Sequence, residues 1–132
     1  MSAAVQTEFE TISIAPLTPS VGAEIGGVKM SGDLPDEQIA EIRQALLDWK
    51  VIFFRDQDGS VAEHVAFGRR FGELEIHPFT PNREDFPEVV IIHHGEDSKY
   101  GQNGWHSDVT WRQEPSLGSI LRGKIIPDVG GD

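Results

Sequence analysis

NGWHSDVTW, residues 103–111, is the stretch of the sequence from which the fold class follows. In an extended segment, side chains two residues apart point to the same side. His106 and Asp108 can therefore converge on one ion while the Ser107 side chain turns away. An imidazole and a carboxylate suit Fe(II), and a second histidine would complete a facial triad that leaves coordination positions open. Alone the pair is weak evidence, because a histidine and an aspartate also meet by chance on surface loops.

The composition limits the kind of protein that carries this motif. The 132 residues suffice for one domain with a hydrophobic core. A formal net charge of −11 repels phosphate backbones and anionic lipid, so we expect neither nucleic acid nor membrane as a partner. The N-terminus lacks the pattern of a secretory signal, and the absence of cysteine fits a reducing compartment, so a cytoplasmic location is expected. Any metal must be held by histidine and carboxylate.

Apolar alternation and short apolar runs predict several strands. The predicted strands cover 12–17, 21–30, 51–54, 88–94 and 116–126. The third, VIFF, is apolar throughout and is predicted to be buried. Residues 1–10 are polar and are expected to be disordered, and the loop 95–104 separates the fourth strand from the motif.

Two helices are expected in the first half of the chain. Apolar residues recur at helical spacing over 35–48, which predicts an amphipathic helix. A second helix over about 61–71 is opened by a capping box, in which Ser60 and Glu63 each satisfy an otherwise unpaired backbone N–H. Gly72 is placed to close this helix.

Several segments in the same order resemble the taurine dioxygenase family of Fe(II)- and 2-oxoglutarate-dependent dioxygenases. The stretch 103–111 resembles the family's iron-binding W-H-x-D-x-T-[FW] motif. The other matching segments are IAPLTPSVGAEIGGVKMSG (14–32), VIFFRDQ (51–57), FGRRFGELEIHP (67–78) and GSILRGKIIPDVGGD (118–132). Co-linear matches over nearly the whole chain are far more specific than a single His-x-Asp pair.

The resemblance implies an α+β fold. We expect a partial double-stranded β-helix, the jelly-roll or cupin-like architecture, with N-terminal helices packed on the sheet. The predicted strands are too few to close a barrel, and Gly-Gly-Asp at 130–132 is turn chemistry that leads onward. Residues 1–132 are therefore expected to be the N-terminal portion of a single dioxygenase domain, truncated before the barrel is complete. The alternative is a natural protein that ends here in a ragged tail.

The resemblance also implies roles for individual residues. His106 and Asp108 match the first two iron ligands. His77 matches a histidine that contacts the sulfonate in taurine-using members, although a loop histidine that caps the turn at Pro78 is an equally good interpretation. The remaining histidines are less suitable. They are His64, on a helix face with phenylalanines, and the adjacent His93 and His94, which point to opposite faces of a strand.

Two departures from the family pattern concern the substrate. Thr80 stands where taurine enzymes have a tyrosine beside the substrate, and Gln102 stands where they have an asparagine. Asn103, one place on, could substitute for that asparagine if the loop shifts. These changes put taurine itself in doubt and leave the reaction type unchanged.

The implied activity uses Fe(II), 2-oxoglutarate as cosubstrate and O2. It hydroxylates a small anionic organic substrate, with an alkyl sulfonate such as taurine as the first choice, and releases succinate and CO2. Sulfate esters, aryloxyalkanoates and other small carboxylates compete as substrates. Many members of the family are homo-oligomers, so the resemblance leaves a homo-oligomer open.

The residues that bind the cosubstrate are expected beyond Asp132. In the family, the third iron ligand is a distal histidine, and an arginine pairs with the far carboxylate of 2-oxoglutarate; neither has a counterpart in this sequence. The isolated chain is therefore expected to be inactive. Two alternatives are a truncated or decayed non-catalytic module of the same fold and a His/Asp site loaded with zinc.

Overall fold

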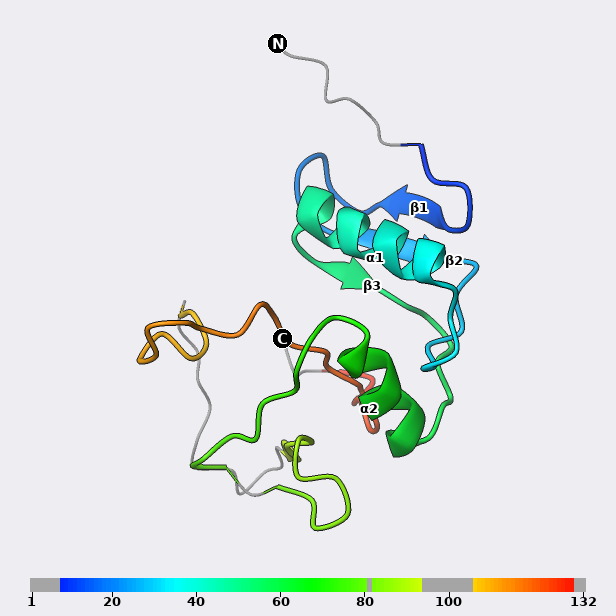
Figure 1. Cartoon of the computed structure of the whole chain (residues 1–132). Coiled ribbons are helices and arrows are strands. Elements are labelled where there is room, and N and C mark those ends of the chain that lie inside the picture. The colour runs from blue at the N-terminus through cyan, green and yellow to red at the C-terminus, as the bar shows by residue number, and fades with distance from the viewer. Residues whose placement is uncertain (1–7, 81, 94–105, 130–132) are drawn as a thin grey trace. The chain divides into compact units, whose positions relative to one another are not determined.

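The computed structural model describes residues 8–80, 82–93 and 106–129 (Figure 1). The chain divides into two compact units, residues 1–90 and 91–132. All helices and strands assigned in the described part belong to the first unit. Neither of these helices has the length and apolar character needed to cross a membrane.

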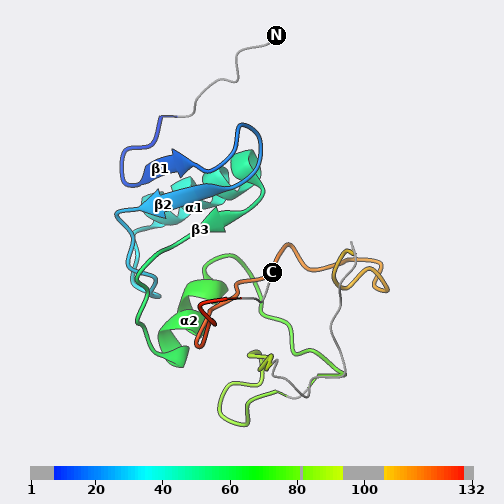
Figure 2. The ribbon, with the colours of Figure 1, turned by 180° about the vertical axis from the view of Figure 1, so that it is seen from behind.

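The first unit contains a small sheet with a helix on one face. Its strands, in the spatial order β1-β2-β3, are β1 (Ser13–Pro16), β2 (Ala23–Gly26) and β3 (Ile52–Phe53). β1 and β2 pair antiparallel, whereas β2 and β3 pair parallel. A parallel pair needs a crossover connection, and α1 (Asp36–Trp49) provides it. Figures 1 and 2 show α1 lying across one face of the sheet.

The core lies between α1 and the sheet and extends to α2 (Val61–Arg69). Its buried members come from the residue before β1, from β2 and from both helices: Ile12, Ile25, Ile39, Ile42, Ala45 and Phe67. Phe67 of α2 is 2% exposed and makes edge contacts with the rings of Phe54 and Phe71, at centroid distances of 6.0 and 5.1 Å. α2 is therefore fixed to the same core as α1 through one aromatic side chain.

The start of α2 is the predicted capping box. The Ser60 hydroxyl accepts a hydrogen bond from the Glu63 backbone N–H at 3.2 Å, and the Glu63 carboxylate accepts one from the Ser60 N–H at 2.6 Å. The predicted end was too late. The helix ends at Arg69 with Arg70 as its cap, and Gly72, with φ of 148°, lies two residues further on.

Three predictions about strands are corrected. β3 has only two residues, and Phe53 is 39% exposed, so the run 51–54 is not buried throughout. No strand forms over 88–93 or 116–126; the described residues show only an isolated bridge between Asn82 and Val90. Alternation shows which face of a strand is apolar, but a strand also needs a partner to pair with its backbone. The α+β class holds, and the jelly roll stays a prediction.

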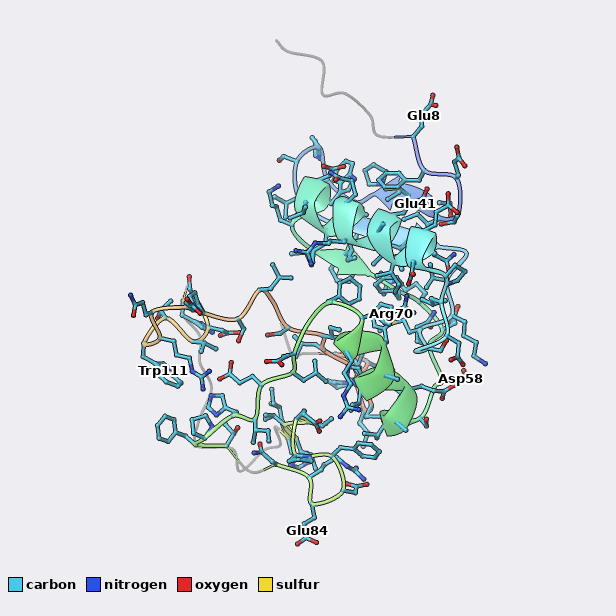
Figure 3. The ribbon with its side chains drawn as sticks, viewed as in Figure 1. Glu8, Glu41, Asp58, Arg70, Glu84 and Trp111 are labelled. Carbon is cyan, nitrogen blue, oxygen red and sulfur yellow. The ribbon has the colours of Figure 1, made fainter. Side chains whose placement is uncertain are left out.

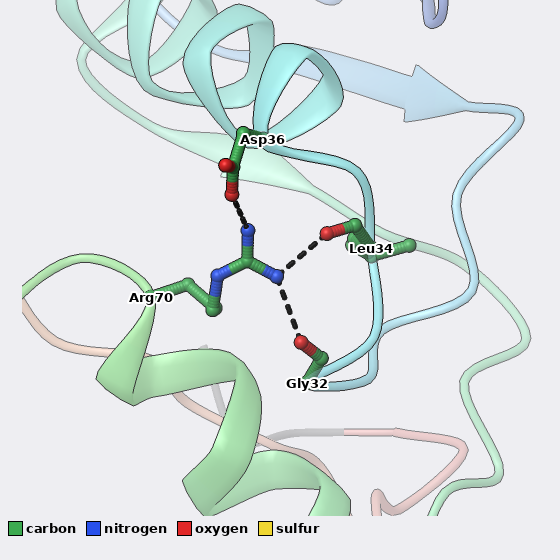
Figure 4. A network of polar contacts seen from close by, with 4 residues as sticks. All are labelled: Gly32, Leu34, Asp36 and Arg70. Carbon is green, nitrogen blue, oxygen red and sulfur yellow. Dashed lines mark hydrogen bonds and ion pairs between the residues drawn. The ribbon is translucent and has the colours of Figure 1, made fainter.

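Arg70 ties the end of α2 to the turn that precedes α1 (Figure 4). One guanidinium nitrogen donates to the carbonyl oxygens of Gly32 and Leu34 at 2.7 and 2.6 Å, and another donates to the Asp36 carboxylate at 2.5 Å. The Asp36 side chain is fully exposed, so the ion pair itself contributes little. The two carbonyl bonds are part-buried and hold the two segments together.

Replacing Arg70 should therefore destabilise the first unit. We expect Arg70→Met to lower the free energy of unfolding by about 1–3 kcal/mol, because it leaves two part-buried carbonyls without their donor. Arg70→Lys should recover only part of this loss, since an ammonium group lacks the planar fork. Urea unfolding of both variants, with Arg43→Lys at an exposed position of α1 as control, measures the effect. Full recovery by lysine would contradict this role.

Glu41, which Figure 3 labels on α1, holds the segment that leads into β1. Its carboxylate accepts hydrogen bonds from the backbone N–H groups of Glu10 and Thr11, at 2.7 and 2.9 Å, and from the Thr11 hydroxyl at 2.6 Å. Partial burial acts to raise the pKa of the Glu41 carboxyl, but these hydrogen bonds outweigh it and hold the pKa below its ordinary value of 4.5.

A lowered pKa in the folded state makes this contribution depend on pH. It is fully present above the unfolded value and is lost as pH falls through the folded pKa. We expect Glu41→Gln to lower the free energy of unfolding by about 1 kcal/mol at neutral pH. The difference from the parent should shrink at about pH 3. Urea unfolding at both pH values tests this, with Glu84→Gln on an exposed loop as control. A difference that is constant with pH would rule out the carboxylate as its source.

Candidate metal centre

The predicted ligand pair lies in the second unit, on a turn. Residues 106 and 107 have no regular structure, and 108–111 form a turn in which Val109 has a positive φ of 55°. The Arg112 N–H donates to the Val109 carbonyl at 3.1 Å and closes this turn. The expectation of an extended segment through 108 is therefore wrong.

The two side chains nevertheless converge. His106 Nε2 and Asp108 Oδ1 are 3.1 Å apart, and the two side chains are 52% and 67% exposed. Two ligands at right angles on one ion, each about 2.1 Å from it, are about 3.0 Å apart. The observed separation fits this arrangement. It is also the length of an ordinary hydrogen bond, so the distance is compatible with either pairing.

The donor atoms suit a ferrous ion. A neutral imidazole and a carboxylate are two of the three ligands in the 2-His-1-carboxylate arrangement of non-haem iron. Within the described ranges, however, no group of three or more histidine, cysteine, aspartate or glutamate side chains is placed to hold a metal. The pair fits iron as part of a site, and a further ligand has to come from another residue.

A hollow of about 550 Å³, with a lining that is more apolar than polar, adjoins Asp108. It lies within the second unit and is lined by Ser107, Asp108, Thr110, Pro115, Ser116, Leu117, Gly118 and Ser119. Four of these residues carry hydroxyl groups, which donate and accept hydrogen bonds. The hollow therefore offers polar contacts beside the carboxylate.

Trp111, the last residue of the motif, is exposed. Its side chain, labelled in Figure 3, is 58% exposed, and the Arg112 guanidinium lies 4.8 Å from the ring centroid. Trp105, which precedes His106 in the motif, lies outside the described residues.

Further positions named by the sequence predictions, His94 among them, also fall outside the described residues. Gln102 and Asn103, predicted to bind substrate, have no structural description, so their roles stay predictions. The same holds for Asp132, the residue beyond which the cosubstrate-binding groups are expected. No cosubstrate-binding residue is therefore assigned within the described part of the chain.

The predicted substrate histidine lies on a loop of the first unit. His77 Nδ1 accepts a hydrogen bond from the Phe79 N–H at 3.3 Å, so this ring nitrogen closes the turn around Pro78. This contact agrees with the interpretation of His77 as a loop histidine that caps the turn at Pro78. Because Nδ1 accepts, the neutral ring carries its proton on Nε2, which is a donor.

The same loop contains polar atoms that lack a protein partner. Thr80 Oγ1 and Asn82 Oδ1 are buried, and no hydrogen bond to either is found in the described part of the chain. The Asn82 amide nitrogen donates to the His77 carbonyl at 3.1 Å. Buried polar atoms of this kind usually have a water or ligand partner. Sequence reasoning missed Asn82, because nothing in the PNRED run distinguishes it from an ordinary turn asparagine.

Comparison with known families gives a match over most of the chain. A family model described as taurine catabolism dioxygenase TauD, TfdA family matches residues 13–132. The chain is similar to the alkylsulfatase of Acinetobacter baylyi, at 36% identity over 100% of this chain and 41% of the relative. It is also similar to the alpha-ketoglutarate-dependent sulfate ester dioxygenase of Pseudomonas putida, at 36% identity over 92% of this chain and 40% of the relative.

A solved structure gives a consistent result for the fold. The chain resembles a taurine dioxygenase from Burkholderia xenovorans with a TM-score of 0.58 and 40% sequence identity, over 61% of this chain and 29% of that one. The chain thus spans about two fifths of the length of the two curated relatives, 41% and 40%.

Proposed function

Because this chain belongs to the taurine catabolism dioxygenase family TauD, TfdA, we propose that it forms part of an Fe(II)- and 2-oxoglutarate-dependent dioxygenase. The enzyme hydroxylates a small anionic organic compound, with an alkyl sulfonate as first candidate, and releases succinate and CO2. The observation that carries the proposal is the convergence of His106 Nε2 and Asp108 Oδ1 within the family match. Sulfate esters are the second candidate, because two relatives at 36% identity are an alkylsulfatase and a sulfate ester dioxygenase.

His106 and Asp108 would hold the ferrous ion. When bound, Fe(II) supplies the activation of O2 that accompanies oxidative decarboxylation of 2-oxoglutarate. The Asp108 carboxylate lowers the net positive charge at the ion, and the neutral His106 ring must keep Nε2 free of its proton to serve as a ligand. The hydroxyl-lined hollow beside Asp108 offers hydrogen bonds to oxygen atoms of a bound compound.

The loop around His77 supports an anionic substrate. The Nε2–H of His77 and the hydroxyl of Thr80 are both donors, and the buried Thr80 Oγ1 has no hydrogen-bond partner among the described residues. A sulfonate or sulfate oxygen would accept from such groups.

The activity is tested with the protein that the complete reading frame around these residues encodes. Alkyl sulfonates, sulfate esters and aryloxyalkanoates are supplied with Fe(II), 2-oxoglutarate and O2, and succinate is measured. We expect one class to stimulate succinate release. His106→Ala and Asp108→Ala should each reduce that release at least about 100-fold, because even residues behind metal ligands can contribute 10–100-fold. His93→Ala, at an exposed histidine, should leave it unchanged.

Three results would count against the proposal. Equal activity in the parent and in both ligand variants would remove His106 and Asp108 from the site. A polypeptide that binds 2-oxoglutarate but consumes no O2 with any anion would favour a non-catalytic module of the same ancestry. Activity that appears with zinc and without O2 consumption would favour the zinc-loaded site.

We expect the 132-residue chain alone to show no catalytic turnover. His106 and Asp108 alone would hold iron weakly. No residue in the described part of the chain is assigned to the far carboxylate of 2-oxoglutarate, so the cosubstrate would be weakly held as well. We expect succinate release equal to that of a reaction without protein, and a Mn(II) affinity that is weak and unchanged by His93→Ala. Mn(II) titration followed by electron paramagnetic resonance, together with a succinate assay, measures both. Substrate-dependent succinate from this chain would show that the third ligand lies within it.

A further inference from the structure

Asn82 joins the two ends of the loop that carries His77. Its side-chain amide nitrogen donates to the His77 carbonyl oxygen at 3.1 Å in a part-buried setting. The ring of the same histidine is held less firmly, because the Phe79 N–H reaches Nδ1 at 3.3 Å, at the long end for such a bond. The direction of the ring therefore depends on the loop backbone that the Asn82 contact closes.

Asn82 is itself fixed by pairing with a later segment of the first unit. Its backbone forms an antiparallel bridge with Val90. Next to this bridge, the Arg83 N–H donates to the Val89 carbonyl oxygen at 3.2 Å. These backbone contacts give Asn82 a defined position from which its side chain reaches His77.

The segment that pairs with Asn82 is tied to α2. Glu88, whose side chain is 15% exposed, accepts a hydrogen bond from the Arg69 guanidinium at 2.7 Å. Arg69 is the last residue of α2, and Phe67 of the same helix is buried in the core. A continuous series of contacts thus runs from the core of the first unit through Glu88 and Asn82 to His77.

The Asn82 side chain adds little net stability through these contacts. Its Oδ1 atom is buried, and the described residues provide it with no hydrogen-bond partner. Burying an acceptor without a partner costs free energy of at least the order that one hydrogen bond gains. Because the two effects oppose each other, the contact with His77 serves orientation more than stability.

We propose that Asn82 is a positioning residue for anion binding: by holding the His77 carbonyl, it sets the direction in which the Nε2–H group of His77 meets the substrate. This inference rests on the proposed function, in which His77 donates to the substrate anion. Asn82 acts through His77 and not by contact with the substrate. Its removal therefore weakens binding of the anion and leaves the chemical step unchanged.

The first test follows the His77 side chain in the 132-residue chain by NMR. Three-bond couplings between Hα and Hβ show whether the ring keeps one rotamer or moves among several. We expect two unequal couplings in the parent chain and averaged couplings in Asn82→Ala. Asn82→Asp, which keeps the size of the side chain and removes the donor, should show the same averaging. Gln44→Ala is the control, because it removes an amide that donates to Asp48 on the exposed face of α1.

The second test measures the kinetics of the protein that the complete reading frame encodes, with the anion that stimulates succinate release. Asn82→Ala should raise KM for the anion about three- to tenfold, the equivalent of one hydrogen bond, and leave kcat within about twofold of the parent. In a His77→Ala background the same substitution should raise KM by less than about twofold, because its effect passes through His77. A residue that only stabilises the loop would raise KM equally in both backgrounds.

The two tests fail separately. His77 couplings that stay unequal in both Asn82 variants, or that are already averaged in the parent chain, would overturn the proposal whatever the activity of the protein. An equal rise in KM with and without His77, or a fall in kcat at constant KM, would also overturn it. If no anion stimulates succinate release, the proposed function fails, and the couplings alone decide whether Asn82 positions the ring.

Discussion

Burial of apolar side chains between α1 and the sheet is the constraint on which the described fold depends. β2 and β3 can pair in parallel only because α1 provides the crossover between them. α1 stays on the sheet because its own residues Ile39 and Ile42 are buried. Fully burying one such side chain stabilises by about 1.5–3 kcal/mol. α2 joins this core through Phe67, so one apolar cluster positions both helices.

The candidate metal site is built without such support. His106 and Asp108 lie in the unit whose described residues include no buried side chain, and both are more than half exposed. A ligand pair on an exposed turn loses conformational entropy when a metal fixes it, and this loss weakens binding. Metal sites are normally held by packing and by hydrogen bonds behind their ligands. The motif thus specifies the donor atoms, while the described residues of this unit supply no buried packing that would hold them.

Sequence reasoning succeeded where the signal is local. The capping box at Ser60 and the apolar spacing of α1 depend on residues a few positions apart, and both appear in the structure. It failed at 88–93 and 116–126, where strand formation depends on a partner that local pattern cannot supply. It also missed the roles of Arg70 and Glu41, since each binds backbone about 30 or more residues away. For the site, spacing predicted the convergence of His106 with Asp108 but not the turn that achieves it.

The two units therefore differ in what their sequences require. The first buries large apolar side chains in a common core, as Phe67 and Ile42 at 2% and 1% exposure show. The second has aliphatic residues as apolar as those of the first, yet leaves Leu121 and Ile125 in solvent at 82% and 91%.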